Sequence, residues 1–163
     1  MGGAIDELVK RNLDHRADSE SARAARPGLR VAVLTCMDAR IRPGVAMGLE
    51  LGEAHVIRNA GGLVTEDALR SLAISQGALG TREVMVVMHT RCGLEGDEHE
   101  LRKELARAAG LAPPFPLGRF ASLERALREG VQRIRTTPWL PHRDQVRGFV
   151  YDVDEGRLRE VEI

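Results

Sequence analysis

Residues 31–40, VAVLTCMDAR, lead from an apolar run into a thiol, a carboxylate and a guanidinium, each two residues apart. The run that ends at Thr35 is apolar and rich in β-branched residues, as in strands that are buried on both faces of a parallel sheet. Polar side chains begin abruptly at Cys36. This change predicts a buried strand over residues 29–35, with reactive groups at its carboxyl end.

On both sides of this stretch, apolar runs alternate with helical patterns along the chain. Further strands are predicted at 54–57, 83–88, 146–153 and 158–163, and helices at 43–51, 65–79, 97–109 and 123–135. Strands that alternate with helices are typical of an open, mostly parallel α/β sheet flanked by helices. The turn at 154–156 is too short for a parallel crossover, so the last two strands should pair antiparallel.

The length of 163 residues predicts a single domain, 1–163, because domains usually span about 100–200 residues. Residues 4–25 predict an amphipathic helix, and Pro27-Gly28 separates it from the first strand. Its apolar stripe is thin for a helix that packs in the core of a monomer. We therefore expect residues 1–28 to form an N-terminal helical arm. At this point it could equally lie on its own domain or on a partner subunit.

The composition excludes several classes of partner. Acidic and basic residues balance at 24 each, so no net field attracts the chain to nucleic acid or anionic lipid. No apolar window approaches the length of about 18 residues that spans a membrane. The first residues, MGGAIDELVK, also lack the apolar core of a signal peptide. We expect a cytoplasmic protein whose two cysteines are thiols or metal ligands rather than a disulfide.

Two of the predicted strands lead into loops with reactive side chains, CMDAR at 36–40 and HTRCG at 89–93. Because ligand sites gather at the carboxyl ends of parallel strands, Cys36, His89 and Cys92 can converge. Two thiolates and an imidazole suit Zn²⁺, and a set of three protein ligands leaves an open position, as in catalytic zinc sites. For each cysteine alone, the alternative is a small buried apolar residue. The other histidines are predicted to be surface or structural residues: His15, His55, His99 and His142.

Asp38 and Arg40 have two interpretations. As an ordinary surface ion pair they would contribute only about 0–1 kcal/mol. Beside a zinc ion, Arg40 can hold the Asp38 carboxylate ionised and oriented through a bidentate contact. The carboxylate would then accept a hydrogen bond or a proton from zinc-bound water, or fill the fourth zinc position itself and close the site.

A rival interpretation is that Cys36 to Arg42 forms the Cys-x₅-Arg loop of a cysteine phosphatase. In that chemistry, loop amides hold a dianion while a cysteine of low pKa attacks it. Three features disfavour it here: Asp38 would repel phosphate, the loop contains no glycine, and Pro43 supplies no amide at the start of the following helix.

Cys-x-Asp-x-Arg at 36–40 followed by His-x-x-Cys at 89–92 resembles the β-class carbonic anhydrases, and residues 48–93 and 146–158 resemble their short prokaryotic branch. The resemblance implies a zinc enzyme that interconverts CO₂ and bicarbonate. By motif position, Cys36, His89 and Cys92 would be the zinc ligands and Asp38 with Arg40 the gate of the fourth position. The backbone amide of Gly93 would lie near bound bicarbonate.

The same resemblance implies four parallel strands with an antiparallel edge strand. It also implies a homodimer or a dimer of dimers, in which the N-terminal helix packs on the neighbouring subunit. One departure concerns Arg91, where close relatives commonly carry Asp; zinc binding should survive, while anion entry or proton transfer could change.

We expect activity to rise above neutral pH, because two thiolates cancel the formal charge of Zn²⁺ and weaken its effect on bound water. Two alternatives remain: hydrolysis of CS₂ or COS at the same site, and a non-catalytic zinc-binding module whose site is permanently closed.

Overall fold

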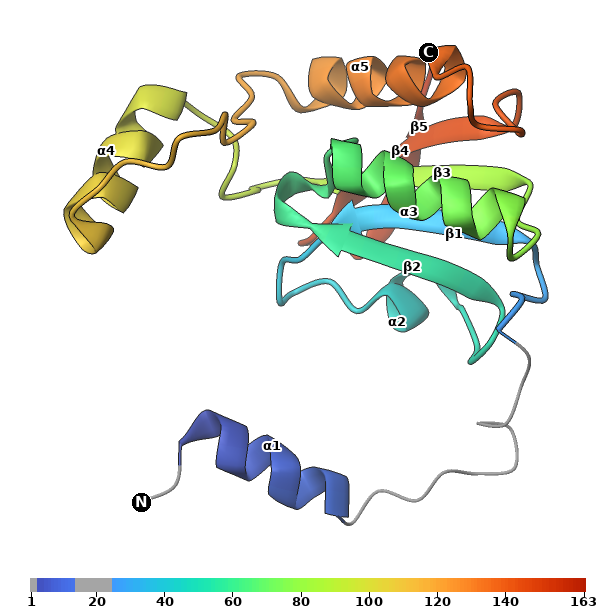
Figure 1. Ribbon diagram of the computed structural model, residues 1–163, viewed down its shortest axis with the longest axis horizontal. Helices are drawn as coiled ribbons and strands as arrows, with labels where there is room; N and C mark the ends of the chain where they lie inside the picture. Colours follow the sequence, from blue (N-terminus) through green and yellow to red (C-terminus); the bar gives the residue numbers. More distant parts are fainter. Residues whose placement is uncertain (1–2, 14–24) are drawn as a thin grey trace.

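A five-stranded sheet forms the centre of the computed structural model, which describes residues 3–13 and 25–163 (Figure 1). The strand order is β2-β1-β3-β4-β5. The first four strands are parallel, and β5 pairs antiparallel with β4 at the edge, as predicted. The bounds of the strands are β1 Val31–Cys36, β2 Ala54–Asn59, β3 Glu83–His89, β4 Val146–Asp152 and β5 Arg157–Val161.

The helices lie close to their predicted positions: α1 Ala4–Leu13, α2 Pro43–Met47, α3 Glu66–Gly77, α4 Glu98–Ala109, α5 Leu123–Thr136 and the short 3-10 helix η1 Ala60–Gly62. The Thr65 side chain accepts a hydrogen bond from the amide of Ala68 and so caps α3. Helix α2 is shorter than predicted, because Gly48 takes a left-handed conformation and ends it. The helix predicted over 4–25 is present as α1, and its remainder lies outside the described residues.

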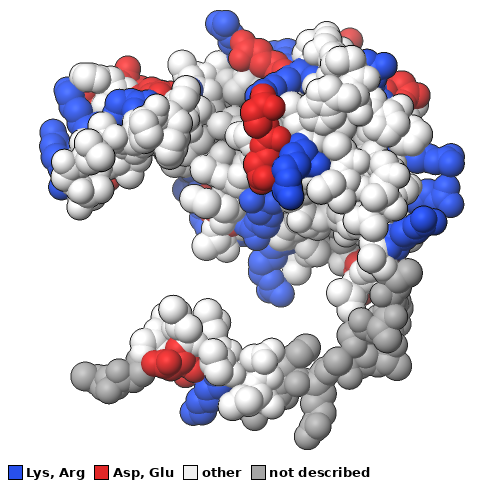
Figure 2. Space-filling model, viewed as in Figure 1, with Lys and Arg blue, Asp and Glu red and all other residues white. Residues whose placement is uncertain are grey.

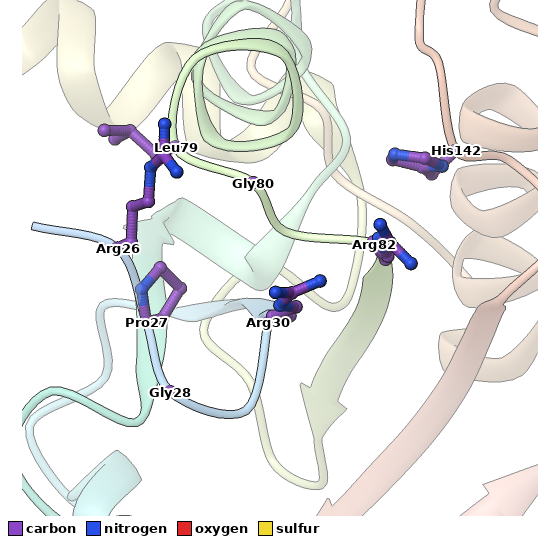
Figure 3. Close-up of a pocket in the computed structure, with 8 residues that line it drawn as sticks. All are labelled: Arg26, Pro27, Gly28, Arg30, Leu79, Gly80, Arg82 and His142. Atoms are coloured by element: carbon purple, nitrogen blue, oxygen red, sulfur yellow. The ribbon is translucent and has the colours of Figure 1, made fainter.

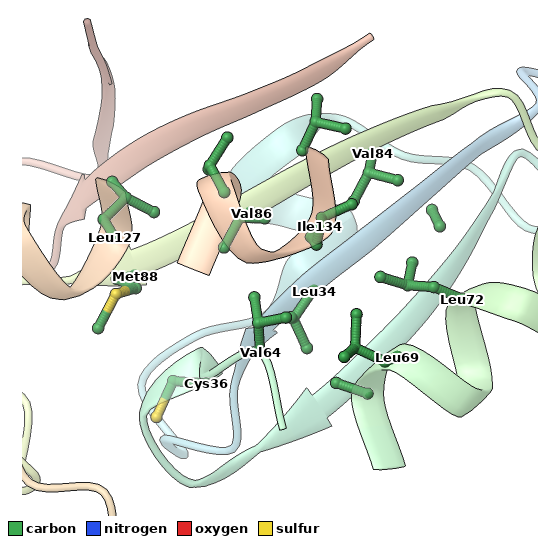
Figure 4. Packing of buried hydrophobic residues seen from close by; sticks show 14 of the residues in the cluster. Leu34, Cys36, Val64, Leu69, Leu72, Val84, Val86, Met88, Leu127 and Ile134 are labelled. Atoms are coloured by element: carbon green, nitrogen blue, oxygen red, sulfur yellow. The ribbon is translucent and has the colours of Figure 1, made fainter. Parts of the chain in front are cut away.

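The core is built on alternate residues of the central strands. Leu34 and Val86 pack in a cluster with residues of α3 and α5, such as Leu72 and Ile134 (Figure 4). The neighbouring strand residues point to the opposite face and are buried as well, for example Val33 at 1% exposure. Burial on both faces explains why β1 and β3 are nearly continuous apolar runs in the sequence.

Three of the described helices contribute no buried residue to this core, namely α1, α2 and α4. Figure 1 shows α1 and α4 standing away from the sheet. Within the described part of the chain, the helices are too short or too polar to cross a membrane.

Candidate metal centre

Three potential ligands meet where β1 and β3 end. The ligand atoms of Cys36, His89 and Cys92 lie within 4.8 Å of one another, and all three residues are buried. Cys36 is the last residue of β1 and His89 the last of β3, which are parallel neighbours in the sheet. Cys92 follows β3 in a tight turn, so that its thiol returns to the strand ends.

The His89 ring is oriented by its own neighbour. Its Nδ1 lies 2.9 Å from the Thr90 carbonyl oxygen, which can only accept, so Nδ1 carries the proton. The other nitrogen, Nε2, is buried and has no hydrogen-bond partner among the described residues. A buried lone pair of this kind is costly unless it is satisfied. Coordination of a metal ion at Nε2 would satisfy it, so the residues present fit a zinc ion.

The two thiols differ in their surroundings. Burial raises the pKa of Cys92 above its ordinary value. Burial also acts to raise the pKa of Cys36, but the His89 ring and the backbone amides of Asp38 and Gly61 outweigh it and lower this pKa to about 7. The Gly61 amide donates to the Cys36 sulfur over 3.3 Å. Cys36 is therefore the thiol that is more easily ionised before any metal arrives.

Asp38 and Arg40 form a bidentate pair at the edge of this cluster. Arg40 Nε donates to Asp38 Oδ1 over 2.9 Å and Arg40 Nη2 to Oδ2 over 2.8 Å. These hydrogen bonds hold the pKa of Asp38 well below its usual range. Asp38 Oδ2 also lies 3.8 Å from His89 Nε2. An ionised carboxylate thus faces the space beside the candidate ligands.

Arg58 and the loop after β2 complete the site, and sequence analysis missed their role. Arg58 donates to the carbonyl oxygens of Cys36 over 2.9 Å and of Asp38 over 2.8 Å. Gly62 has a φ of +66°, and an added Cβ would lie only 3.0 Å from the Val87 carbonyl oxygen. Their position in the sequence could have indicated this role, because residues 58–62 lie at the end of a parallel strand, at the same edge of the sheet as Cys36.

A small cavity of about 150 Å³ opens beside the cluster. Its wall combines both cysteines and Asp38 with small or apolar groups, and it includes Gly93, as sequence analysis expected. The lining residues are Cys36, Met37, Asp38, Ala60, Gly61, Cys92, Gly93 and Leu94. Arg42 is not among them and is exposed, so the structure gives no support to a phosphatase loop.

Comparisons with known proteins agree with this geometry. The model of a family described as carbonic anhydrase matches residues 31–110. β-Carbonic anhydrase 1 from Mycobacterium tuberculosis is 36% identical over 157 residues, which cover 96% of each chain. The chain belongs to the β-carbonic anhydrase family. The crystal structure of carbonic anhydrase from Streptococcus mutans matches with a TM-score of 0.90 at 37% identity, over 99% of each chain.

A second activity occurs among the relatives of this β-carbonic anhydrase. Carbon disulfide hydrolase from Acidianus sp. is 33% identical over 156 residues, which cover 80% of this chain and 76% of that protein. Family membership confirms the resemblance based on the two motifs and makes the chain an enzyme of the lyase class.

The other described histidines, His55, His99 and His142, are not part of the metal centre. His55 is structural, since its ring contacts the Ser75 hydroxyl and the Ala25 carbonyl oxygen. His99 is exposed near the start of α4, and His142 is partly buried before β4. His15 lies outside the described residues.

Proposed function

We propose that the chain catalyses the reversible hydration of CO₂ to bicarbonate and a proton, at a zinc ion held by Cys36, His89 and Cys92. The main support is a buried set of three candidate ligand atoms that lie within 4.8 Å of one another, next to an ionised carboxylate. The chain's membership of the β-carbonic anhydrase family supports the same reaction. When bound there, zinc supplies a Lewis acid that makes a water molecule more acidic.

In this proposal the residues of the chain position the reactants. Asp38 accepts a hydrogen bond from the reacting water, and Arg40 holds both carboxylate oxygens so that this acceptor keeps one orientation. The apolar side chains of Met37 and Leu94 give CO₂ a place in the cavity. The backbone amide of Gly93 donates to the product bicarbonate.

Stopped-flow CO₂ hydration on the purified, zinc-analysed protein tests this proposal. We expect one zinc ion per chain and a rate that rises from mildly acidic to mildly alkaline pH. Cys92→Ser should lose zinc and activity together, because a serine hydroxyl is a poor substitute for a thiolate ligand. A metal-free preparation that stays fully active, or a rate that does not change with pH, would contradict the proposal.

Hydrolysis of CS₂ or COS is the second candidate, favoured by the relatives that are named carbon disulfide hydrolases. Both molecules are linear analogues of CO₂, so the same residues could serve either reaction. CS₂ turnover by the preparation used for CO₂ hydration decides between them. Zinc binding without turnover of any of the three molecules would instead indicate a non-catalytic zinc module.

We further propose that the chain is cytoplasmic and works as a homodimer or a dimer of dimers, in which the N-terminal arm of residues 1–28 packs on the partner subunit through α1, while Ala25 and Gly28 contact this chain's own β2 region. The support is α1, whose apolar side chains are all exposed in the described part of a single chain. Ile5 is 77% and Leu13 79% exposed. A stripe of this kind is normally covered by protein.

A further inference from the structure

A second pocket lies at the end of the sheet opposite the metal centre. Its volume is about 510 Å³, and its wall contains three arginines and a histidine among eight lining residues (Figure 3). These residues are Arg26, Pro27, Gly28, Arg30, Leu79, Gly80, Arg82 and His142. Arg30 immediately precedes β1 and Arg82 immediately precedes β3. The pocket therefore lies where these strands begin, whereas the metal centre lies where they end.

The cationic groups of this pocket are not used elsewhere in the described structure. Within residues 3–13 and 25–163, the guanidinium groups of Arg26, Arg30 and Arg82 make no hydrogen bond or ion pair. Some exposed arginines elsewhere are neutralised by a carboxylate, as Arg147 is by Glu160 and Arg125 by Glu129. Figure 2 shows Lys and Arg atoms gathered at the edge of the molecule where β1 and β3 begin. In a chain of zero net charge, this is a local positive field that is free to attract an anion.

A chain of polar contacts joins the two walls of the pocket. His55 contacts the Ala25 carbonyl oxygen over 3.0 Å and the Ser75 hydroxyl over 2.8 Å, and Ser75 contacts the Thr81 hydroxyl over 2.8 Å. Ser75 and Thr81 are buried. This chain ties the segment that carries Arg26 to the turn that carries Arg82. The walls are thus held in place before any ligand binds.

The backbones of Arg30 and Arg82 are also linked directly. Arg30 has a φ of 54°, in the left-handed region that non-glycine residues rarely adopt. Its carbonyl oxygen accepts a hydrogen bond of 2.7 Å from the Arg82 amide. Strained backbone that persists in a folded chain is concentrated at functional sites. Here it places two arginines side by side at one opening.

The fourth polar residue of the pocket is anchored from α3. The side-chain amide of Gln76 donates to the His142 carbonyl oxygen over 2.8 Å, and the His142 amide donates back to Gln76 over 3.1 Å. Gln76 is itself 97% buried, being 3% exposed. The loop before β4 therefore presents the His142 imidazole from a fixed position across from Arg82 (Figure 3).

We propose that this pocket binds a small molecule that carries phosphate. Guanidinium groups match phosphate oxygens in geometry and charge, and three of them exceed what a single negative charge such as bicarbonate requires. A volume of about 510 Å³ is larger than one phosphate needs and fits a small organic ligand. Leu79 and Pro27 offer apolar surface for the organic part.

Isothermal titration calorimetry on the zinc-loaded full chain tests the proposal, with inorganic phosphate, pyrophosphate, AMP and bicarbonate as probes. We expect saturable binding of at least one phosphate probe to a single site per chain, weakened by added salt. Tighter binding of AMP than of inorganic phosphate identifies an organic ligand, and the reverse identifies a free inorganic one. Absence of saturable binding for all phosphate probes, or equal affinity for bicarbonate, overturns the proposal.

The double variant Arg30→Gln with Arg82→Gln locates the site. Loss of two charge-assisted contacts should weaken phosphate binding at least about tenfold. Arg107→Gln, an exposed arginine in the last turn of α4, controls for the loss of positive charge and should leave the affinity unchanged. Zinc content and circular dichroism show whether the variants fold. Unchanged affinity in a folded double variant would place the phosphate elsewhere, for example at the metal centre, and overturn the assignment.

Discussion

Arg40 is held on two sides, by the Asp38 carboxylate and by the backbone of Arg91. Its Nη2 donates to Asp38 Oδ2 over 2.8 Å and to the Arg91 carbonyl oxygen over 2.9 Å. Arg91 has a left-handed backbone with a φ of 54°, and its side chain pairs with Asp154 in the turn between β4 and β5. Position 91 therefore supports the Asp38–Arg40 pair through its backbone, whichever side chain it carries.

Arg40→Lys should separate orientation from charge at this pair. A lysine keeps the positive charge but cannot hold both carboxylate oxygens, so kcat/KM for CO₂ hydration should fall about 10–100-fold while zinc is retained. Stopped-flow kinetics and metal analysis measure the two quantities. Arg42→Lys, at an exposed arginine outside the cavity, is the control and should change neither. Equal rates in both variants would show that the bidentate contact is unimportant.

Zinc affinity should depend on pH through the two thiols. Only thiolates bind the metal, so each proton that must leave makes the affinity rise about tenfold per pH unit. Below the Cys36 pKa of about 7 both thiols are protonated, and two protons leave on binding. Above it, only Cys92 still loses a proton, because burial raises its pKa. Chelator competition on the metal-free protein should show this decrease in slope near neutral pH; an affinity that is constant with pH would refute it.

At the scale of elements, local pattern and tertiary contact decide different features. β1 and β3 were predictable because burial on both faces leaves uninterrupted apolar runs. β2 extends two residues beyond its prediction, to Asn59, because it pairs with β1 as far as Cys36. In the sequence, Arg58 and Asn59 are polar and look like loop residues rather than strand residues. Their partners, such as the Cys36 carbonyl oxygen, come from another strand and are invisible to local pattern.

Gly62→Ala should show how closely the loop after β2 must approach the strands. The new Cβ would lie 3.0 Å from the Val87 carbonyl oxygen and 3.1 Å from the Cys36 amide, at a φ of +66°. We expect a loss of about 1–3 kcal/mol in the free energy of unfolding, measured by urea denaturation, with weaker zinc binding.

Gly110→Ala is the matched control for this variant. Gly110 has a similar φ of +76° at the end of α4, but nothing lies within 4 Å of an added Cβ. It should cost only the backbone strain of a left-handed alanine, about 1 kcal/mol, and leave zinc binding unchanged. Equal losses in the two variants would mean that the close approach at Gly62 carries no extra cost.

At the scale of the whole molecule, the sequence predicted the metal centre where the parallel strands end, but not the arginine pocket where they begin. Parallel strands bring Cys36 and His89 to one edge, so topology alone predicted their meeting. The arginine pocket could not be predicted in this way. Its residues lie on three separate loops, and their convergence depends on contacts such as the His55–Ser75 pair, which no motif encodes.

The exposed stripe of α1 gives a prediction for assembly. Leu8→Ser with Leu13→Ser should lower the mass of the protein in solution from a dimer or tetramer towards a monomer, because the variant loses apolar area that the partner would cover. Lys10→Ser on the same helix is the control and should leave the mass unchanged. Light scattering after size exclusion measures both. A wild-type chain that is itself monomeric would refute the role assigned to α1.

The pairing of Asp38 with Arg40 has a consequence for where the reaction's proton goes. A carboxylate whose pKa lies so far below its usual range is a good hydrogen-bond acceptor but a poor store for a proton. Among the described residues, none of the side chains that line the cavity is a second histidine that could relay it. We therefore expect the proton to leave with a base dissolved in the surrounding water. Turnover should therefore speed up with buffer concentration at fixed pH and ionic strength, until a different step limits the rate.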